Sequence, residues 1–179
     1  NVLSSRGNQI IQPEYGELAS GLEGEGRLAE PENITEYVSN YFLDLATLRG
    51  KKIIVTAGPT HEAIDPVRFI GNHSSGKMGF AIAEIAAQRG AEVVLVSGPV
   101  SLTTPEGVER VDITSAQEMF DSVLRFFTES DIVIMAAAVA DYSVKHPSTS
   151  KIKKKTADLD LKLEKTKYVL LKIGESKDH

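Results

Sequence analysis

Four short runs rich in valine and isoleucine constrain the fold of this chain more than any other feature. The runs lie at 51–58, 91–99, 107–113 and 131–142. Short apolar runs of this kind are typical of the buried strands of a parallel sheet. Helical periodicity occupies two of the stretches between them, at 76–88 and 114–130. This alternation predicts an α/β domain with a three-layer, Rossmann-like parallel sheet that carries helices on both faces.

Further elements are predicted on either side of this core. A helix is expected at 32–47, where Ile34, Tyr37 and Tyr41 begin the apolar stripe of one helix face. Residues 1–30 are rich in Gly and Glu and show little periodicity, and we expect a loop at "ELASGLEGEGRLAEP", residues 17–31. At 151–164 the stretch "KIKKK" is followed by leucines that alternate with charged residues. Such alternation predicts a half-exposed strand, and hence a protruding two-stranded arm, before a short helix in the last stretch, "YVLLKIGESKDH".

Composition and charge exclude several classes of function. The 179 residues include no Cys, which removes disulfides, thiolate metal sites and thiol nucleophiles. The formal net charge of −5 argues against a general nucleic-acid binder. The longest apolar run, Ile132 to Ala140, is too short to span a membrane, and no signal peptide is visible. We therefore expect a cytoplasmic protein with no nucleic-acid partner and no membrane partner.

Ligands of open α/β sheets bind outside the carboxyl ends of the strands, where this chain is rich in small residues. One such stretch, "GNHSSGKMGF", almost matches a nucleoside-triphosphate P-loop. However, Met78 stands where the Mg²⁺-binding hydroxyl belongs, and the stretch does not follow its strand directly. We predict instead an anion site made by Ser74, Ser75 and the amides of a helix start. The alternative is that Ser74 or Ser75 only caps the helix and that Lys77 is solvated.

Four polar residues near the strand ends are candidates for chemistry, and each has a plainer alternative. Asn72 can donate to a carbonyl oxygen, or it can form an Asx-turn. Arg68 can bind phosphate, or it can form a surface ion pair with Asp65. Asp141 can bind a ribose hydroxyl, a base amino group or Mg²⁺, or it can cap a turn. Lys151 can neutralise a triphosphate, or it can belong to a solvated lysine face.

Several segments together resemble a known family. "TAGPT", "DPVRFIGNHSSGKMGFAIA", "GAEVVLVSGPVSL", "AAAVADY" and "KIKKK" resemble, in this order, the phosphopantothenoylcysteine synthetase domain of bacterial bifunctional coenzyme A biosynthesis proteins. "GELASGLEGEGRLAEPE" resembles the substrate-clamping flap that ends the flavin-dependent decarboxylase domain of these proteins. The resemblance implies a decarboxylase tail at 1–31, a linker helix at 32–50 and a C-terminally incomplete ligase domain at 51–179. Ser20 stands where the family usually has the Cys that completes the decarboxylase reduction.

The resemblance also implies a reaction. The family joins 4'-phosphopantothenate to cysteine with CTP, through an acyl-cytidylate and release of pyrophosphate, and its members are homodimers. CTP would arrive with Mg²⁺, and FMN would belong only to the decarboxylase domain outside this chain. By resemblance, Lys151 serves acyl-cytidylate formation and Asn72 serves the second step. Asn72 and Arg68 are expected to contact substrate. The nucleotide-binding residues implied are Gly58, Ser74, Ser75, Gly76, Met135, Ala136, Ala137, Asp141 and Lys151.

One departure from the family and two alternatives remain open. Where the family has an Asn-Pro-Asp or Thr-Pro-Asp segment that helps to hold the nucleotide, this chain has "TKYVL" at 166–170. Weak or no turnover is therefore expected from residues 1–179 by themselves, and a non-catalytic nucleotide-binding fragment is one alternative. The other, an NAD(P)-dependent oxidoreductase, requires a G-x-G-x-x-G turn, where the sequence has "AGPTHE". The choice of CTP over ATP depends on the resemblance alone.

Overall fold

The computed structural model describes residues 2–17, 21–154 and 158–175, without the side chains of 43–45. The chain divides into two units, Asn1–Thr47 and Leu48–His179, each of which is described by itself. None of the described helices combines the length and the apolar character that crossing a membrane requires.

The N-terminal unit contains more regular structure than its sequence predicted. A short helix α1 (Val2–Ser5) precedes an antiparallel hairpin of β1 (Glu14–Glu17) and β2 (Glu23–Arg27), and α2 (Pro31–Leu45) follows. The helix predicted at 32–47 is confirmed within two residues at its ends. The loop predicted at 17–31 is wrong, because β2 lies within it. The hairpin was missed because its strands are rich in Gly and Glu, which have low strand propensity. Ser20 lies outside the described residues.

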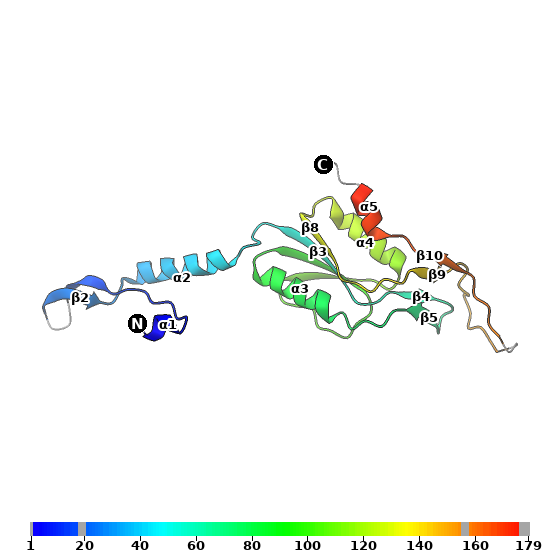
Figure 1. Ribbon diagram of the computed structural model, residues 1–179, viewed down its shortest axis with the longest axis horizontal. Helices are drawn as coiled ribbons and strands as arrows, with labels where there is room; N and C mark the ends of the chain where they lie inside the picture. Colours follow the sequence, from blue (N-terminus) through cyan, green and yellow to red (C-terminus); the bar gives the residue numbers. More distant parts are fainter. Residues whose placement is uncertain (1, 18–20, 155–157, 176–179) are drawn as a thin grey trace. The chain divides into compact units, whose positions relative to one another are not determined.

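The second unit is built on a parallel sheet of four strands in the order β7-β6-β3-β8 (Figure 1). The strands are β3 (Lys52–Ala57), β6 (Glu92–Ser97), β7 (Val108–Asp112) and β8 (Ile132–Met135). All four predicted strands are confirmed. The chain moves outward from β3 to β6 and β7 and then crosses back to place β8 on the other side of β3. The carboxyl ends of β3 and β8 therefore form the switch point at which such sheets bind ligands.

Helices cover both faces of this sheet, as predicted (Figure 1). α3 (Lys77–Gln88) packs on the face that carries Ile53, Val55 and Leu95. α4 (Ala116–Phe127) packs on the opposite face with the short helix α5 (Val169–Glu175) beside it. Neighbouring residues of a strand point to opposite faces, so one strand supplies both cores. Each fully buried aliphatic side chain contributes about 2 kcal/mol to stability.

A hairpin occupies part of the long connection between β3 and α3, which the sequence presented as a loop. It consists of β4 (His61–Ala63) and β5 (Phe69–Gly71), paired antiparallel. The hairpin is attached to the start of α4, because the amide of His61 donates to the carbonyl of Thr114 over 2.7 Å. The side chain of Glu62, which is buried, accepts from the amide of Ala116 over 2.8 Å. Two three-residue strands are too short for periodicity to reveal them.

Replacing Glu62 by Gln is expected to lower the free energy of unfolding by about 0.5–1 kcal/mol, because a negative charge leaves the positive end of α4. Glu62→Ala is expected to cost about 1–3 kcal/mol, because the buried amide of Ala116 loses its acceptor. Urea denaturation measures both values. Glu106→Gln, at an exposed position, is the matched control and should stay within about 0.5 kcal/mol of the wild type. Equal stabilities of Glu62→Ala and the wild type would contradict the assigned contact.

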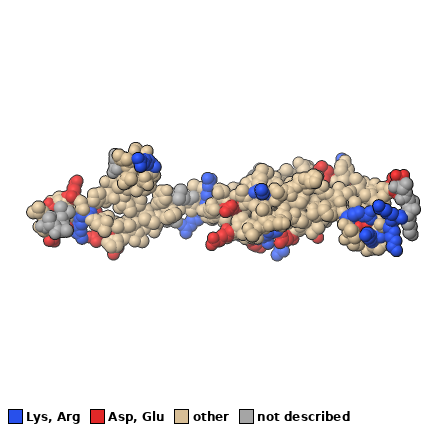
Figure 2. All heavy atoms as spheres, turned by 90° about the horizontal axis from the view of Figure 1, so that it is seen from below, with Lys and Arg blue, Asp and Glu red and all other residues tan. Residues whose placement is uncertain are grey.

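The arm is present, but its strands lie elsewhere than predicted. β9 (Tyr142–Val144) pairs antiparallel with β10 (Leu163–Lys165) at the base of the arm, and residues 145–162 connect them. Of the described residues in the range predicted as a two-stranded arm, 151–154 and 158–164, only the last two belong to a strand. Figure 2 shows Lys and Arg side chains gathered on this part of the unit.

Candidate active site

The loops that leave β3, β6 and β8 meet at one rim of the sheet. Pairing of β3 with β8 continues beyond the strands, since the amide of Ala138 donates to the carbonyl of Gly58 over 2.8 Å. On the other side, the amide of Gly98 donates to the carbonyl of Ala57 over 2.9 Å. The backbones approach so closely that a Cβ atom at Gly98 would lie 1.6 Å from the carbonyl oxygen of Pro59. Only glycine fits at position 98, and the rim is built mainly of backbone.

The start of α3 lies at the same rim. Its N-cap is Gly76, which has a φ of 74° in the left-handed region and makes no side-chain cap hydrogen bond. A Cβ atom at Gly76 would lie 3.4 Å from the amide nitrogen of Gly58, so the two predicted glycines are neighbours. The alternative that Ser74 or Ser75 is the N-cap is wrong, because the Ser74 hydroxyl accepts from the Gly76 amide at 3.3 Å instead. The first-turn amides point out of the helix end, as an anion site requires.

Thr56 holds the predicted nucleotide segment after β8 in place. This fully buried side chain accepts hydrogen bonds from the amides of Ala136 and Ala137 over 3.1 and 3.2 Å. Those two amides are therefore not available to a ligand, and the segment offers carbonyl groups and small side chains instead. Thr56 was not among the residues predicted from the sequence. Its signal was a hydroxyl within an otherwise apolar strand, which must find a partner when it is buried.

Two further threonines fix the end of the same segment. The hydroxyl of Thr60 accepts from the Ala140 amide over 2.9 Å, and the hydroxyl of Thr166 donates to the Ala140 carbonyl over 2.7 Å. The Thr166 amide also donates to the carbonyl of Asp141 over 3.0 Å. The "TKYVL" stretch, which departs from the family pattern, is thus attached directly to the predicted nucleotide residues. The carboxylate of Asp141 is left exposed.

A cavity of about 590 Å³ lies between these two segments. Its walls include Met135, Ala137 and Asp141 from the predicted nucleotide set, and the 166–170 stretch. A volume of this size is in the range of small-molecule sites. The structure thereby groups three predicted residues around one cavity.

Asn72 is also attached to the segment after β8. Its side-chain nitrogen donates to the carbonyl of Val139, 67 positions away in the sequence, over 2.9 Å. The Asn72 side chain therefore makes a long-range hydrogen bond in place of the Asx-turn that was the alternative. One N–H and the carbonyl oxygen of the exposed side chain remain for a ligand.

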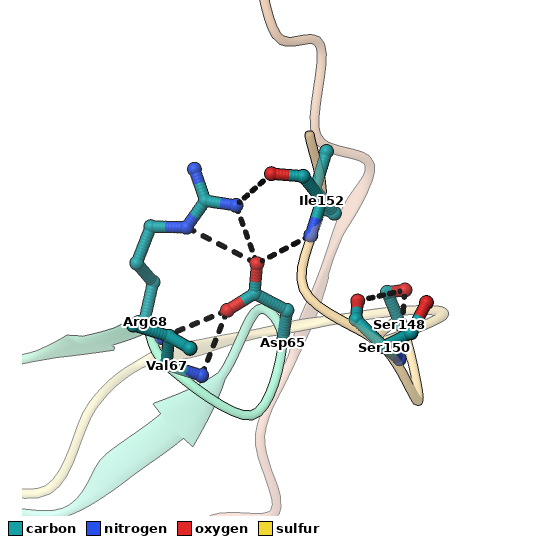
Figure 3. Close-up of polar contacts among 6 residues, drawn as sticks. All are labelled: Asp65, Val67, Arg68, Ser148, Ser150 and Ile152. Carbon is teal, nitrogen blue, oxygen red and sulfur yellow. Dashed lines mark hydrogen bonds and ion pairs between the residues drawn. The ribbon is translucent and has the colours of Figure 1, made fainter. Parts of the chain in front are cut away.

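Arg68 has a different environment from the exposed ion pair that was considered for it (Figure 3). Its guanidinium forms an ion pair with the carboxylate of Asp65, whose side chain is 0% exposed. It also donates to the carbonyl of Ile152, on the arm, over 3.0 Å. The alternative of an ion pair with Asp65 is therefore confirmed, except that the carboxylate is buried and does not lie at the surface. The predicted contact of Arg68 with substrate stays a prediction.

The Arg68 hydrogen bond, followed by that from the Ile152 amide, holds the pKa of Asp65 far below its ordinary value of 3.8, although burial opposes the shift. Asp65 is consequently ionised at neutral pH, and the guanidinium of Arg68 neutralises its charge in the ion pair.

Lys151, the residue before Ile152, is exposed on the arm. Among the described residues, its amine makes no hydrogen bond or ion pair with the rim. The structure therefore joins Gly58, Gly76 and the segment after β8 directly. Lys151 lies instead on the arm, whose described backbone is attached to the β4–β5 connection at Ser148 and Ile152. Within the described part of the chain, no three His, Asp or Glu side chains gather in a way that would hold a metal ion.

Comparison with known proteins places this site in a family. The family model of the DNA/pantothenate metabolism flavoprotein C-terminal domain matches residues 48–179. The chain belongs to this family. It is 48% identical over 177 residues to the Haemophilus influenzae protein named Coenzyme A biosynthesis bifunctional protein CoaBC, covering 99% of this chain and 44% of that protein. It is also 45% identical over 181 residues to a prokaryotic protein of unknown organism named Cysteine/Cysteine sulfinic acid decarboxylase, covering 98% and 50% of the two chains.

A solved structure of the family shares the fold of the second unit. It is a crystal structure of the C-terminal domain of Coenzyme A biosynthesis bifunctional protein CoaBC, 48% identical in sequence with a TM-score of 0.65. The match covers 75% of this chain and 62% of that one. The chain spans about half the length of the curated relatives that it matches.

Proposed function

We propose that this chain carries the phosphopantothenate–cysteine ligase site of a coenzyme A biosynthesis protein and uses CTP. The observation that supports this most is the grouping of Asn72, the segment after β8 and the start of α3 at one rim of the sheet. Membership in the family and the names of the relatives agree with the proposal. A glycine-lined helix start suits the oxygens of a triphosphate, and the cavity that lines the segment after β8 has the volume of a small-molecule site.

The first step would be attack of the 4'-phosphopantothenate carboxylate on the α-phosphorus of CTP. A new P–O bond forms, the bond to the β-phosphate breaks, and pyrophosphate leaves with its electron pair. The α3 start, with Ser74 and Ser75, lies where it can bind phosphate oxygens, and the Lys151 amine would neutralise charge on the triphosphate. We propose that Mg²⁺ enters with CTP and is held largely by the triphosphate oxygens.

The second step would be attack of the cysteine amine on the acyl carbonyl. The C–N bond forms, the amine loses a proton, and CMP leaves with the electrons of the acyl–phosphate bond. Asn72 has one amide N–H free for the oxyanion, and its bond to Val139 holds that N–H in a fixed direction. Preorganised donors of this kind stabilise tetrahedral intermediates.

Several wider features belong to the same proposal. Residues 1–31 would be the tail of a flavin-dependent decarboxylase domain, residues 32–50 a linker and 51–179 the ligase domain, with FMN bound outside this chain. The protein would work in the cytoplasm as a homodimer, for which exposed apolar side chains on the arm, such as Leu163, offer contact surface.

The test is steady-state pyrophosphate release by the protein as its organism makes it, with 4'-phosphopantothenate, cysteine and either CTP or ATP. We expect CTP to support turnover at least about tenfold faster than ATP, a difference of about 1.4 kcal/mol in transition-state binding. Isothermal titration with CTP, ATP and NADH separates the alternatives. CTP binding without pyrophosphate release would indicate a non-catalytic module, and tight NADH binding would indicate an oxidoreductase.

A further inference from the structure

The buried carboxylate of Asp65 takes no part in the reaction proposed above, yet it is the most heavily hydrogen-bonded side chain near the site. It lies in the connection between β4 and β5. Its Oδ1 accepts from the amides of Val67 and Arg68, each over 2.9 Å. Its Oδ2 accepts from the Arg68 guanidinium and, over 3.0 Å, from the amide of Ile152 (Figure 3). Two of these bonds shape the turn, and the bond to Ile152 reaches 87 positions along the chain.

The arm is attached to the β4–β5 connection through both backbone groups of Ile152. The amide of Ile152 donates to Asp65, and its carbonyl accepts from Arg68 over 3.0 Å. A few residues earlier, the amide of Ser148 donates to the carbonyl of Ile64 over 2.9 Å. The Ser148 hydroxyl in turn donates to the Ser150 carbonyl over 2.7 Å. The segment 148–152 therefore runs along the β4–β5 connection and does not extend freely into solvent.

The hairpin that receives the arm also carries Asn72. β5 ends at Gly71, and Asn72 follows it with its side chain bound to the carbonyl of Val139. One short hairpin thus holds a site residue at the end of β5 and the backbone next to Lys151 at its turn. Any change in the docking of Ile152 moves Lys151 relative to Asn72.

We propose that Asp65 is a positioning residue, whose buried carboxylate fastens the arm to the β4–β5 hairpin and so fixes where Lys151 meets the nucleotide. This inference rests on the proposed ligase function and deepens it. Asp65 itself does not contact substrate, because its side chain is fully buried beneath Arg68 and Ile152. Its effect passes through the backbone of the arm.

Asp65→Asn is a sharp test, because each group that hydrogen-bonds to this carboxylate is an N–H donor. The side chain of Asn has one oxygen and one NH₂ group. In either orientation the NH₂ group replaces an oxygen that accepts from at least two N–H groups, so donors face donors there. We expect the Ile152 amide to exchange its hydrogen at least about tenfold faster than in the wild type, which corresponds to a loss of about 1.4 kcal/mol of protection. This measurement requires no enzymatic activity.

The kinetic expectation is a fall of about 100-fold in kcat for pyrophosphate release, the size of effect that a 1 Å misplacement of a reacting group produces. KM for CTP and for 4'-phosphopantothenate should change by less than about threefold, because the nucleotide rim is intact. A purely structural defect would instead lower the melting temperature and the amount of active enzyme without this division between kcat and KM.

A second variant guards against misfolding of Asp65→Asn. Ile152→Pro removes the arm's N–H donor and leaves Asp65 with Arg68, so it should reproduce the fall in kcat. Lys154→Pro, two residues farther along the exposed arm, is the matched control and should stay within about threefold of the wild type.

The outcomes separate the two proposals. Faster exchange at Ile152 with unchanged kcat would overturn the positioning role, and so would equal exchange rates in Asp65→Asn and the wild type. If the wild-type protein releases no pyrophosphate, the proposed function fails. The exchange comparison then still decides whether Asp65 fastens the arm.

Discussion

Replacing Lys151 by Gln is expected to slow pyrophosphate release from CTP and 4'-phosphopantothenate by about 100- to 1000-fold, the usual cost of losing one charge-stabilising group in a transition state. The amine is exposed on a segment whose backbone is held at Ile152, and under the proposed function it would neutralise charge on the bound triphosphate. Gln keeps the length and polarity of the side chain but carries no charge. A rapid-quench assay that follows the acyl-cytidylate measures the step directly.

Lys154→Gln is the matched control for this experiment, since it removes one charge from the same exposed arm. It should stay within about threefold of the wild type, because distant surface charges are screened by salt. Equal rates for Lys151→Gln and Lys154→Gln would leave Lys151 as a solvated lysine and contradict its assigned role.

Asn72→Asp should affect the other half of the reaction. The carboxylate cannot donate to an oxyanion and repels the carbonyl of Val139, whereas attack of the acid on CTP does not need this amide. We therefore expect acyl-cytidylate to accumulate in the variant while release of the cysteine adduct falls by about 100-fold or more. Failure of the intermediate to accumulate, with both steps slowed equally, would contradict the division of roles between Asn72 and Lys151.

Gly98→Ala should have the largest effect on stability. The added methyl would lie 1.6 Å from the carbonyl oxygen of Pro59, so the loops after β3 and β6 would have to separate. We expect a loss of about 3 kcal/mol or more in the free energy of unfolding, as for severe overpacking. Urea denaturation gives this value, and CTP titration of the folded fraction should show weakened binding because the rim is displaced.

Gly174→Ala is the control, because its added methyl would meet no atom within 4 Å and the residue lies within α5. This variant should gain about 0.5–1 kcal/mol from the higher helix propensity of Ala. A stability of Gly98→Ala within about 0.5 kcal/mol of the wild type would mean that the two loops are not packed as described.

The core of the second unit could be predicted from sequence because its signals are local. β3 and β6 are buried on both faces and read as apolar runs, and α3 and α4 show the 3.6-residue period. Once strands and helices alternate, packing leaves little choice but a parallel sheet covered on both sides. The small residues at the strand ends, including Gly58 and Gly76, likewise allowed the position of the rim to be predicted from the sequence.

Tertiary structure decided how distant segments meet. The strand order, the β4–β5 hairpin and the pairing of β9 with β10 depend on contacts between segments that periodicity cannot connect. Thr56 and Asp65 gained their importance from partners 80 and 87 positions away. A buried hydroxyl or carboxylate must satisfy its hydrogen bonds, but sequence alone does not say with which backbone group. Hence the chain's own residues determined which elements form and where ligands can approach, and only the folded arrangement determined what holds Asn72 and Lys151 in place.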